Sequence, residues 1–311
     1  MPNKIKIVFL GNCASAPTSL RNLSSLLLSY NGQGYLFDCP ENTQQQIMKS
    51  SQSAMKINNI FITHMHGDHY FGLFGLLSSF KLNNRVSNLN IYVPKGEKVF
   101  LERLIALIIS DIYKLDYKIN VIEIERGKAL DTQDIVVEAI PLLHSIKTNG
   151  YIFKVKDKVG RFNKAKALKL NIPEGQLFSR LQKGQSIKLG GKIIHPKDVM
   201  DFTFRKVGKK IAYLTDTMPL KKIPKALEDI DILVHESTFF KEDSRKAILV
   251  KHSFAEEVLE FSSKARAGCV YLTHISGKYT DLDKREKQLL KKNKSVRIAR
   301  QLQEIEIDDY K

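Results

Sequence analysis

The chain has 311 residues, 43% of them hydrophobic, and this size and composition predict a globular protein with a large buried core. Its net charge of +17 favours a polyanionic partner, although a proteome rich in lysine would give the same charge. No apolar run approaches the ~18 residues of a membrane span, and three widely separated cysteines, Cys13, Cys39 and Cys269, indicate free thiols in a reducing cytoplasm.

Short apolar strands alternate with helices along the chain. Strands are expected at residues 5–11, 25–30, 34–39, 58–64, 90–94, 117–125, 135–144, 150–156, 209–217, 231–238 and 269–276. Helices are expected at residues 42–50, 71–82, 97–115, 223–230, 254–265 and 283–294. So many strands mixed with helices favour an α/β sandwich over an open parallel sheet.

Residues 155–205 interrupt this alternation. Residues 154–210 hold 16 lysines and arginines against 4 aspartates and glutamates, which is +12 of the total charge of +17. The segment mixes Gly and Lys with few sustained apolar stretches and is too long for an ordinary loop. We therefore expect one domain over residues 1–311, with residues 155–205 inserted as a protruding basic arm that binds phosphates.

The segment "HMHGDH", residues 64–69, is the strongest chemical signal in the sequence. Its three histidines and one aspartate are ligand types that suit zinc. His64 and His66 are two residues apart at the end of a strand, unlike the i, i+4 pair of a helical metalloprotease. Asp68 and His69 are neighbours whose side chains diverge, which favours two metal ions over one.

Two ions need more ligands than this segment offers. His144, Asp216 and His274 each lie near the end of a predicted strand, and an aspartate there can bridge two cations. His195 lies in the basic segment and is interpreted as solvated. His235 is placed beside the site without a role.

The motif H-x-H-x-D-H at residues 64–69 resembles the signature of the metallo-β-lactamase superfamily, whose fold is an αββα sandwich. Several segments narrow the resemblance, over nearly the whole chain and in the same order, to the ribonuclease Z family of tRNA 3′-processing endonucleases. They are "FLGNCASAPTSLRN", "YLFDCPENTQQQIMKS", "THMHGDHYFGLFGLL", "LVHESTF", "KHSFAEE" and "LTHISGKY". The segment "GRFNKAKALKLNIPEGQLFSRLQKG" resembles that family's flexible tRNA-binding arm, or exosite.

The resemblance implies two zinc ions per subunit. It assigns His64, His66 and His144 to one ion, Asp68, His69 and His274 to the other, and Asp216 to both. Asp68 would also accept the proton of the attacking water.

The resemblance further implies that Glu236 and His252 donate a proton to the leaving ribose oxygen. Independently of it, Ser253 and Glu256 have the spacing of a capping box for the helix after His252.

The resemblance also implies the partner. Precursor tRNA would lose its 3′ trailer, leaving a 3′-hydroxyl on the tRNA, and the arm is often presented by a homodimer; neither DNA nor a membrane is expected. Arg21, Asn22 and Lys278 are candidates to contact the acceptor stem. The chain departs from the family at Gly175-Gln176, where Gly-Pro is usual, and at Pro40 and Asn42, where glycines are usual.

Two alternatives remain open. Another dinuclear-zinc hydrolase of the superfamily could act on a small ester or phosphodiester, but it would not need a basic arm. A non-catalytic RNA-binding protein could have kept the fold, but it would not need a full set of ligands.

Overall fold

The computed structural model describes residues 3–110, 115–220 and 222–311. The chain forms two compact units. One, here called the sandwich unit, comprises residues up to 154 together with 209–309, and the other, here called the basic unit, comprises residues 155–208 with 310–311.

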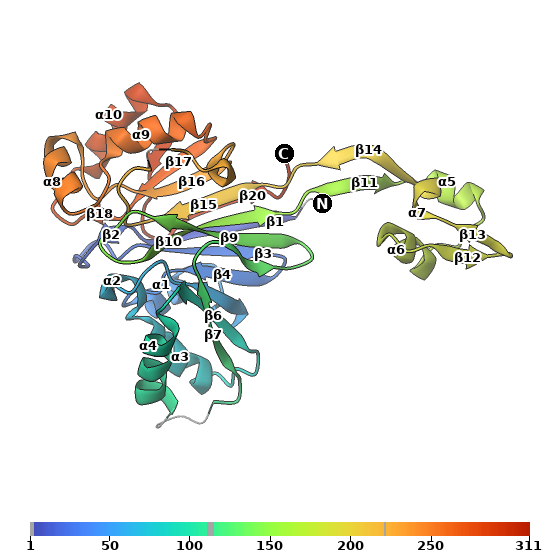
Figure 1. The fold of residues 1–311 in the computed structure, drawn as a ribbon, viewed down its shortest axis with the longest axis horizontal. Coiled ribbons are helices and arrows are strands. Elements are labelled where there is room, and N and C mark those ends of the chain that lie inside the picture. Colours follow the sequence, from blue (N-terminus) through green and yellow to red (C-terminus); the bar gives the residue numbers. More distant parts are fainter. Residues whose placement is uncertain (1–2, 111–114, 221) are drawn as a thin grey trace. The chain divides into compact units, whose positions relative to one another are not determined.

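Two seven-stranded sheets make up the sandwich unit (Figure 1). The first has the order β20 (Gln303–Asp308), β1 (Lys4–Gly11), β3 (Ser25–Tyr30), β4 (Gln33–Phe37), β5 (Ile57–Phe61), β6 (Leu89–Pro94), β7 (Ile119–Ile124). The second has the order β19 (Val296–Ile298), β17 (Cys269–Thr273), β16 (Ile232–Glu236), β15 (Lys210–Leu214), β10 (Thr148–Val155), β9 (Ile135–Leu142), β8 (Gly127–Asp131). A short parallel pair joins β2 (Cys13–Ala14) to β18 (Ile275–Ser276).

Helices cover the outer face of each sheet (Figure 1). The first sheet carries α1 (Thr43–Lys49), α2 (Gly67–Tyr70), α3 (Leu73–Leu82) and α4 (Lys98–Ile105). The second carries α8 (Ser244–Leu249), α9 (Ala255–Lys264) and α10 (Leu282–Lys292). In α3 the buried residues Leu73, Leu76, Leu77 and Phe80 repeat at helical spacing, so one stripe of the helix packs on the sheet.

Aromatic side chains fill the space between the two sheets. Phe37 of β4 lies 6.0 Å from Tyr151 of β10 and 5.9 Å from Tyr213 of β15, measured between ring centroids. Phe61 of β5 lies 5.3 Å from Tyr151. Because side chains alternate along a strand, Leu36, next to Phe37, enters the core between the first sheet and its helices. The predicted αββα sandwich is therefore confirmed.

Two predicted helices differ from the structure. Residues 223–230 form only a short 3₁₀ turn at Lys225–Leu227, so the prediction of an α-helix there was wrong. Pro224 precedes this turn, and Asp229, whose φ is 54°, follows it. The helix predicted at 97–115 is α4, followed by a π-helical turn at Ala106–Ser110, and residues 111–114 lie outside the described part.

The basic unit has a small core of its own. It contains β11 (Lys158–Phe162), α5 (Lys164–Lys169), α6 (Gln176–Gln182), β12 (Ile187–Leu189), β13 (Lys192–Ile194), α7 (Pro196–Val199) and β14 (Met200–Lys206). Seven apolar side chains pack together in it: Ala167, Ile172, Phe178, Leu181, Ile187, Ile194 and Val199. Its lysines lie outside this core, and those exposed on its helices and hairpin include Lys164, Lys166, Lys169, Lys183, Lys188, Lys192 and Lys197.

In the described residues, no helix combines the length and the hydrophobicity that crossing a membrane requires. The cysteines Cys13, Cys39 and Cys269 are free thiols, as predicted.

Candidate metal centre

The site is built at the ends of neighbouring parallel strands. β15, β16 and β17 run parallel, and Asp216, Glu236 and His274 stand at or just after their carboxyl ends. In the first sheet, His64 follows β5 in the same way. Asp216 and His274 adopt left-handed backbone conformations with φ of 48° and 51°, which turn the chain sharply after each strand.

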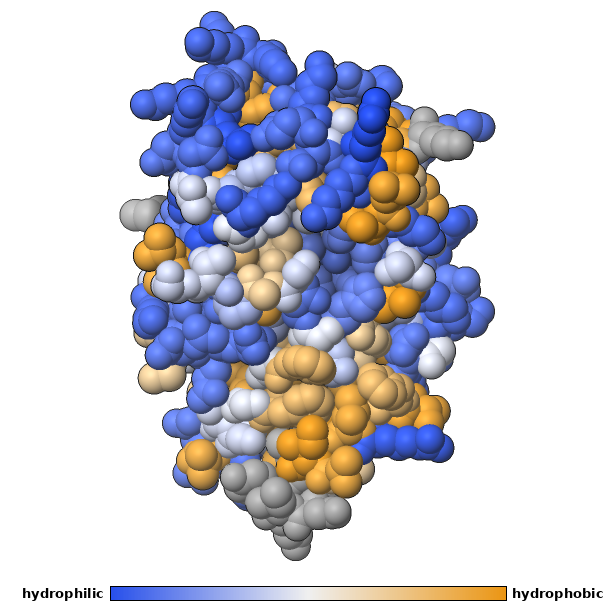
Figure 2. Space-filling view, turned by 90° about the vertical axis from the view of Figure 1, so that its left-hand side faces the viewer, coloured by the Kyte–Doolittle hydropathy of each residue, from blue (hydrophilic) through white to orange (hydrophobic). Residues whose placement is uncertain are grey.

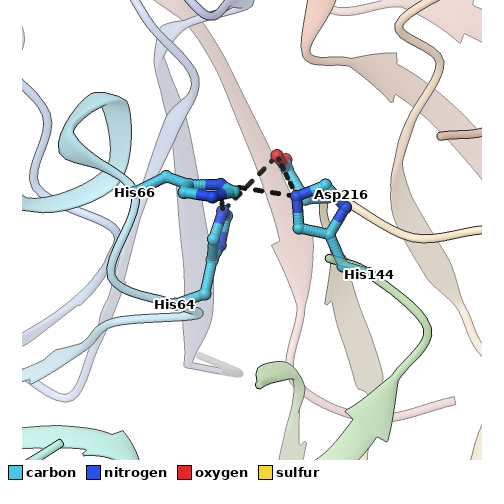
Figure 3. A group of neighbouring side chains, drawn as sticks. All are labelled: His64, His66, His144 and Asp216. Atoms are coloured by element: carbon cyan, nitrogen blue, oxygen red, sulfur yellow. Dashed lines mark hydrogen bonds and ion pairs between the residues drawn. The ribbon is translucent and has the colours of Figure 1, made fainter. Parts of the chain in front are cut away.

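Three histidines and Asp216 form the first group of ligand atoms (Figure 3). His64 Nε2 lies 2.9 Å from His66 Nδ1, which lies 3.4 Å from His144 Nε2. Asp216 Oδ2 lies 3.5 Å from His64 Nε2 and 3.7 Å from His144 Nε2. The three ring nitrogens and the carboxylate oxygen therefore point at a common centre.

Asp68, His69 and His274 form the second group. Asp68 Oδ2 lies 3.6 Å from His69 Nε2 and also 3.6 Å from His274 Nε2. Asp216 Oδ1 lies 3.4 Å from His69 Nε2 and 3.2 Å from His274 Nε2. Each oxygen of Asp216 thus faces one group, which is the arrangement of a carboxylate shared by two cations.

Several observations fit metal ions at these centres. His69 Nε2 and His274 Nε2 are buried and have no hydrogen-bond partner among the described residues, a costly state unless a cation accepts their lone pairs. Burial lowers the pKa of His64, of His66 and of His144, which keeps these imidazoles neutral as ligands must be. Burial opposes ionisation of Asp216, but the imidazoles of His274, His69 and His64 lower its pKa well below the usual range.

In two of the ligand imidazoles, the ring nitrogen that points away from the centre contacts another group of the protein, as is common for histidines that bind metals. His69 Nδ1 lies 2.8 Å from Asp38 Oδ2, and His144 Nδ1 lies 3.1 Å from the backbone oxygen of Lys251. Asp38 also accepts from the Thr63 N–H at 2.8 Å. Asp38 is not among the residues predicted from the sequence; its one sequence signal is that it follows β4, as the ligands follow their strands.

His252 and Glu236 form a pair beside both groups. His252 Nδ1 lies 2.8 Å from Glu236 Oε1, and the His252 ring centroid lies 4.9 Å from that of His144 and 5.5 Å from that of His274. Burial acts to lower the pKa of His252, but the charge and hydrogen bond of Glu236 outweigh it and raise this pKa to about 9. Glu236 therefore favours the protonated form of this ring.

The predicted capping box after His252 is wrong. α9 begins after Phe254, and Ser253 Oγ donates instead to the backbone oxygen of Thr217 at 2.7 Å. The Glu256 carboxylate accepts from the backbone N–H of Lys241. Ser253 therefore holds the His252 loop against the loop after Asp216.

Comparisons with known proteins show the family to which the chain belongs. A family model described as "Anti-Pycsar protein Apyc1" matches residues 5–163, and one described as "Beta-lactamase superfamily domain" matches residues 172–275. Ribonuclease Z of Methanosarcina acetivorans is 36% identical over 97% of this chain and 98% of its own length. Ribonuclease Z of Nitrosopumilus maritimus is 37% identical over 97% of this chain and 100% of its own. The chain belongs to the ribonuclease Z family.

A solved structure agrees with this assignment. Human tRNase Z, short form, has a TM-score of 0.67 and 25% identity, covering 96% of this chain and 98% of that one. The family departure at Asn42 has a simple physical basis, because Asn42 has φ of 64° and asparagine tolerates this left-handed conformation better than other non-glycine residues.

The residues predicted to contact the substrate of a ribonuclease Z hold loops together at one side of the site. Arg21 donates to the backbone oxygens of Ile275 and Ser276 at 3.3 and 3.0 Å. Asn22 is only 5% exposed, and Lys278 Nζ lies 2.6 Å from Asp243 Oδ2. Of these three side chains, Asn22 offers RNA the least surface.

Two further histidines lie apart from the ligand groups. His195 in the basic unit is exposed and lies 2.9 Å from Ser186 Oγ. His235 is buried and packs on Phe261, on the face of β16 opposite Glu236.

Proposed function

We propose that the chain removes the 3′ trailer from precursor tRNA by hydrolysing one phosphodiester bond. The tRNA keeps a 3′-hydroxyl, and the trailer leaves with a 5′-phosphate. The observation that carries the proposal is the carboxylate of Asp216 shared between two ligand groups, with His252 and Glu236 beside both, in a chain of the ribonuclease Z family.

The metal is proposed to be zinc, with two ions per subunit. His64, His66 and His144 would hold one ion and Asp68, His69 and His274 the other, with Asp216 shared. Bound there, the two ions would supply Lewis-acid charge at the phosphate and lower the pKa of the attacking water. Imidazole-rich donor sets with carboxylates suit zinc.

Asp68 is proposed to accept a proton from that water. Of the two ligand carboxylates it is the more accessible, with 16% of its side chain exposed against 4% for Asp216. Burial opposes its ionisation, but the neighbouring imidazoles of His274 and His69 outweigh burial and lower the pKa of Asp68, which favours the carboxylate form that can take up a proton.

His252 is proposed to donate a proton to the departing ribose oxygen. The carboxylate of Glu236 holds the ring and favours its charged form. Donation by such a group typically accelerates a reaction by about 10²–10⁴-fold.

The assay on precursor tRNA tests this function. Zinc-loaded protein is incubated with a precursor that carries a 3′ trailer, and the ends of both products are mapped. One cut that yields a tRNA 3′-hydroxyl and a trailer 5′-phosphate supports the proposal. An intact precursor, with a small ester or phosphodiester hydrolysed instead, contradicts it.

The basic unit is proposed to hold the body of the tRNA through its exposed lysines. Replacing residues 163–199 with an Asn-Gly turn keeps the stem, because Phe162 and Met200 pair across β11 and β14. Without these lysines to pair with phosphates, affinity for tRNA should fall about 10²-fold or more and its salt dependence should flatten. Hydrolysis of bis(p-nitrophenyl) phosphate should stay unchanged; an equal loss in both assays would contradict this division of labour.

A homodimer is also proposed, in the cytoplasm. Figure 2 shows hydrophobic side chains gathered on the part of the face where the first-sheet helices lie. On α4 and the turn that follows it, Val99, Phe100 and Leu107 are 55%, 46% and 70% exposed. An apolar surface of this kind is typical of an interface. Light scattering should give about twice the 35.5 kDa chain mass, and Phe100→Glu should give the monomer; a monomeric wild type would contradict it.

A further inference from the structure

The hydroxyl of Thr238 touches both the metal centre and the acid pair. Its Oγ1 lies 2.8 Å from Glu236 Oε2, 3.0 Å from His274 Nδ1 and 3.2 Å from His252 Nδ1. The Thr238 side chain is buried. One oxygen atom thus joins a predicted metal ligand to the predicted proton donor.

The backbone fixes this oxygen in place. The Thr238 N–H donates to Glu236 Oε2 at 2.9 Å, and the Thr238 carbonyl accepts from the Ser276 N–H at 3.1 Å. The first bond closes the turn after β16, and the second ties that turn to the segment after His274. They do not involve the hydroxyl, so a side chain of the same shape would keep them.

The protons that each group can offer determine which way each bond runs. The Glu236 carboxylate can only accept, so the single hydroxyl proton of Thr238 goes to Glu236 Oε2. The lone pairs of Oγ1 then accept from His274 Nδ1–H. With its proton on Nδ1, His274 presents an unprotonated Nε2 to the centre, where that atom lies 3.2 Å from Asp216 Oδ1 and 3.6 Å from Asp68 Oδ2 and has no hydrogen-bond partner among the described residues.

We propose that Thr238 is a positioning residue that couples metal binding to proton donation. Its hydroxyl selects the His274 tautomer that can bind a cation and, through the same oxygen, holds the Glu236 carboxylate against His252. The second half of the inference rests on the proposed function, because it takes Glu236 and His252 as the proton donor. The first half concerns only metal affinity.

The test compares Thr238→Val, which keeps the shape and loses the hydroxyl, with Thr238→Ser, which keeps the hydroxyl. Thr43→Val is the matched control: its hydroxyl is also buried and donates to the Pro40 carbonyl, away from the ligands. Zinc affinity is measured by competition with a chromophoric chelator, without substrate. Thr238→Val should lower the affinity for one of the two zinc ions about 10–100-fold, which is the usual effect of removing a group that hydrogen-bonds to a metal ligand.

A second measurement addresses proton donation. Thr238→Val should lower kcat on precursor tRNA by about 10-fold or more, the usual contribution of a hydrogen bond to a charged group. The loss should shrink on a precursor whose leaving 3′-oxygen is replaced by sulfur, because a thiolate leaves without a proton. The kcat values on the oxygen and sulfur substrates are both measured with zinc saturating.

Each outcome of these measurements supports or contradicts the proposed role of Thr238. Wild-type zinc affinity in Thr238→Val would overturn the tautomer role, even if the chain cut no tRNA at all. Equal losses in Thr238→Ser and Thr238→Val would show a merely structural role, as would a melting temperature of the metal-free Thr238→Val protein well below that of Thr43→Val. Normal zinc affinity in Thr238→Ser, with loss in Thr238→Val, supports the proposal.

Discussion

Replacing Asp216 with asparagine should weaken zinc binding at both ligand groups and abolish the cleavage of precursor tRNA. Each of its oxygens faces one group, at 3.2 Å from His274 Nε2 and 3.5 Å from His64 Nε2, so this single change affects both groups. We expect at most one zinc ion per chain, by elemental analysis, in place of two. Turnover should fall by about four orders of magnitude or more, which is ~5 kcal/mol on the activation barrier.

A buried aspartate elsewhere is the control for this variant. Asp309 is 1% exposed and accepts a hydrogen bond from the Tyr30 hydroxyl at 3.0 Å, and Asp309→Asn should keep both zinc ions and full activity. An Asp216→Asn protein that retains two zinc ions per chain would contradict the proposal that two ions share the Asp216 carboxylate. Affinity for tRNA should survive in both variants, because the basic unit is intact.

Replacing His252 with alanine should leave two zinc ions in place and still lower turnover of precursor tRNA by about 10²–10⁴-fold. The variant lacks the proposed proton donor, and the Glu236 carboxylate no longer has the imidazole nitrogen that lies 2.8 Å from it in the wild type. Turnover of a precursor with sulfur as the leaving atom should fall much less. Single-turnover kinetics on the two substrates measures the difference.

His235→Ala is the matched control, since His235 is a buried histidine in the same strand as Glu236 that packs on Phe261 and does not face the site. A loss of zinc in His252→Ala would assign His252 to the metals, because His252 also lies within reach of Asp216 and His274. Equal losses on the oxygen and sulfur substrates would contradict proton donation.

The ligand residues could be proposed from the sequence because their signals are local. His64, His66, Asp68 and His69 lie within six positions, and the remaining candidates each follow an apolar strand. The structure brings these seven side chains into two adjoining groups.

The residues that hold the ligands could not be proposed in the same way. Asp38 reaches His69 because β4 and β5 are neighbours, and Thr238 reaches His274 because β16 and β17 are neighbours. Sheet order depends on long-range pairing, which a single aspartate or threonine in a sequence does not reveal.

Local sequence patterns gave a wrong prediction, or none, where tertiary contacts determine the structure. Ser253 and Glu256 have the spacing of a capping box, but their side chains bond to Thr217 and Lys241 of other loops. In the basic unit, single apolar residues separated by lysines gave no periodic signal. They still form a core, because short helices and hairpins fold back on one another.

Anomalous diffraction at the zinc absorption edge, from a crystal of the zinc-loaded protein, tests the central claim most directly. Two peaks should appear, one among His64, His66 and His144 and the other among Asp68, His69 and His274, with Asp216 in contact with both. A single peak, or none at these side chains, would contradict a dinuclear centre.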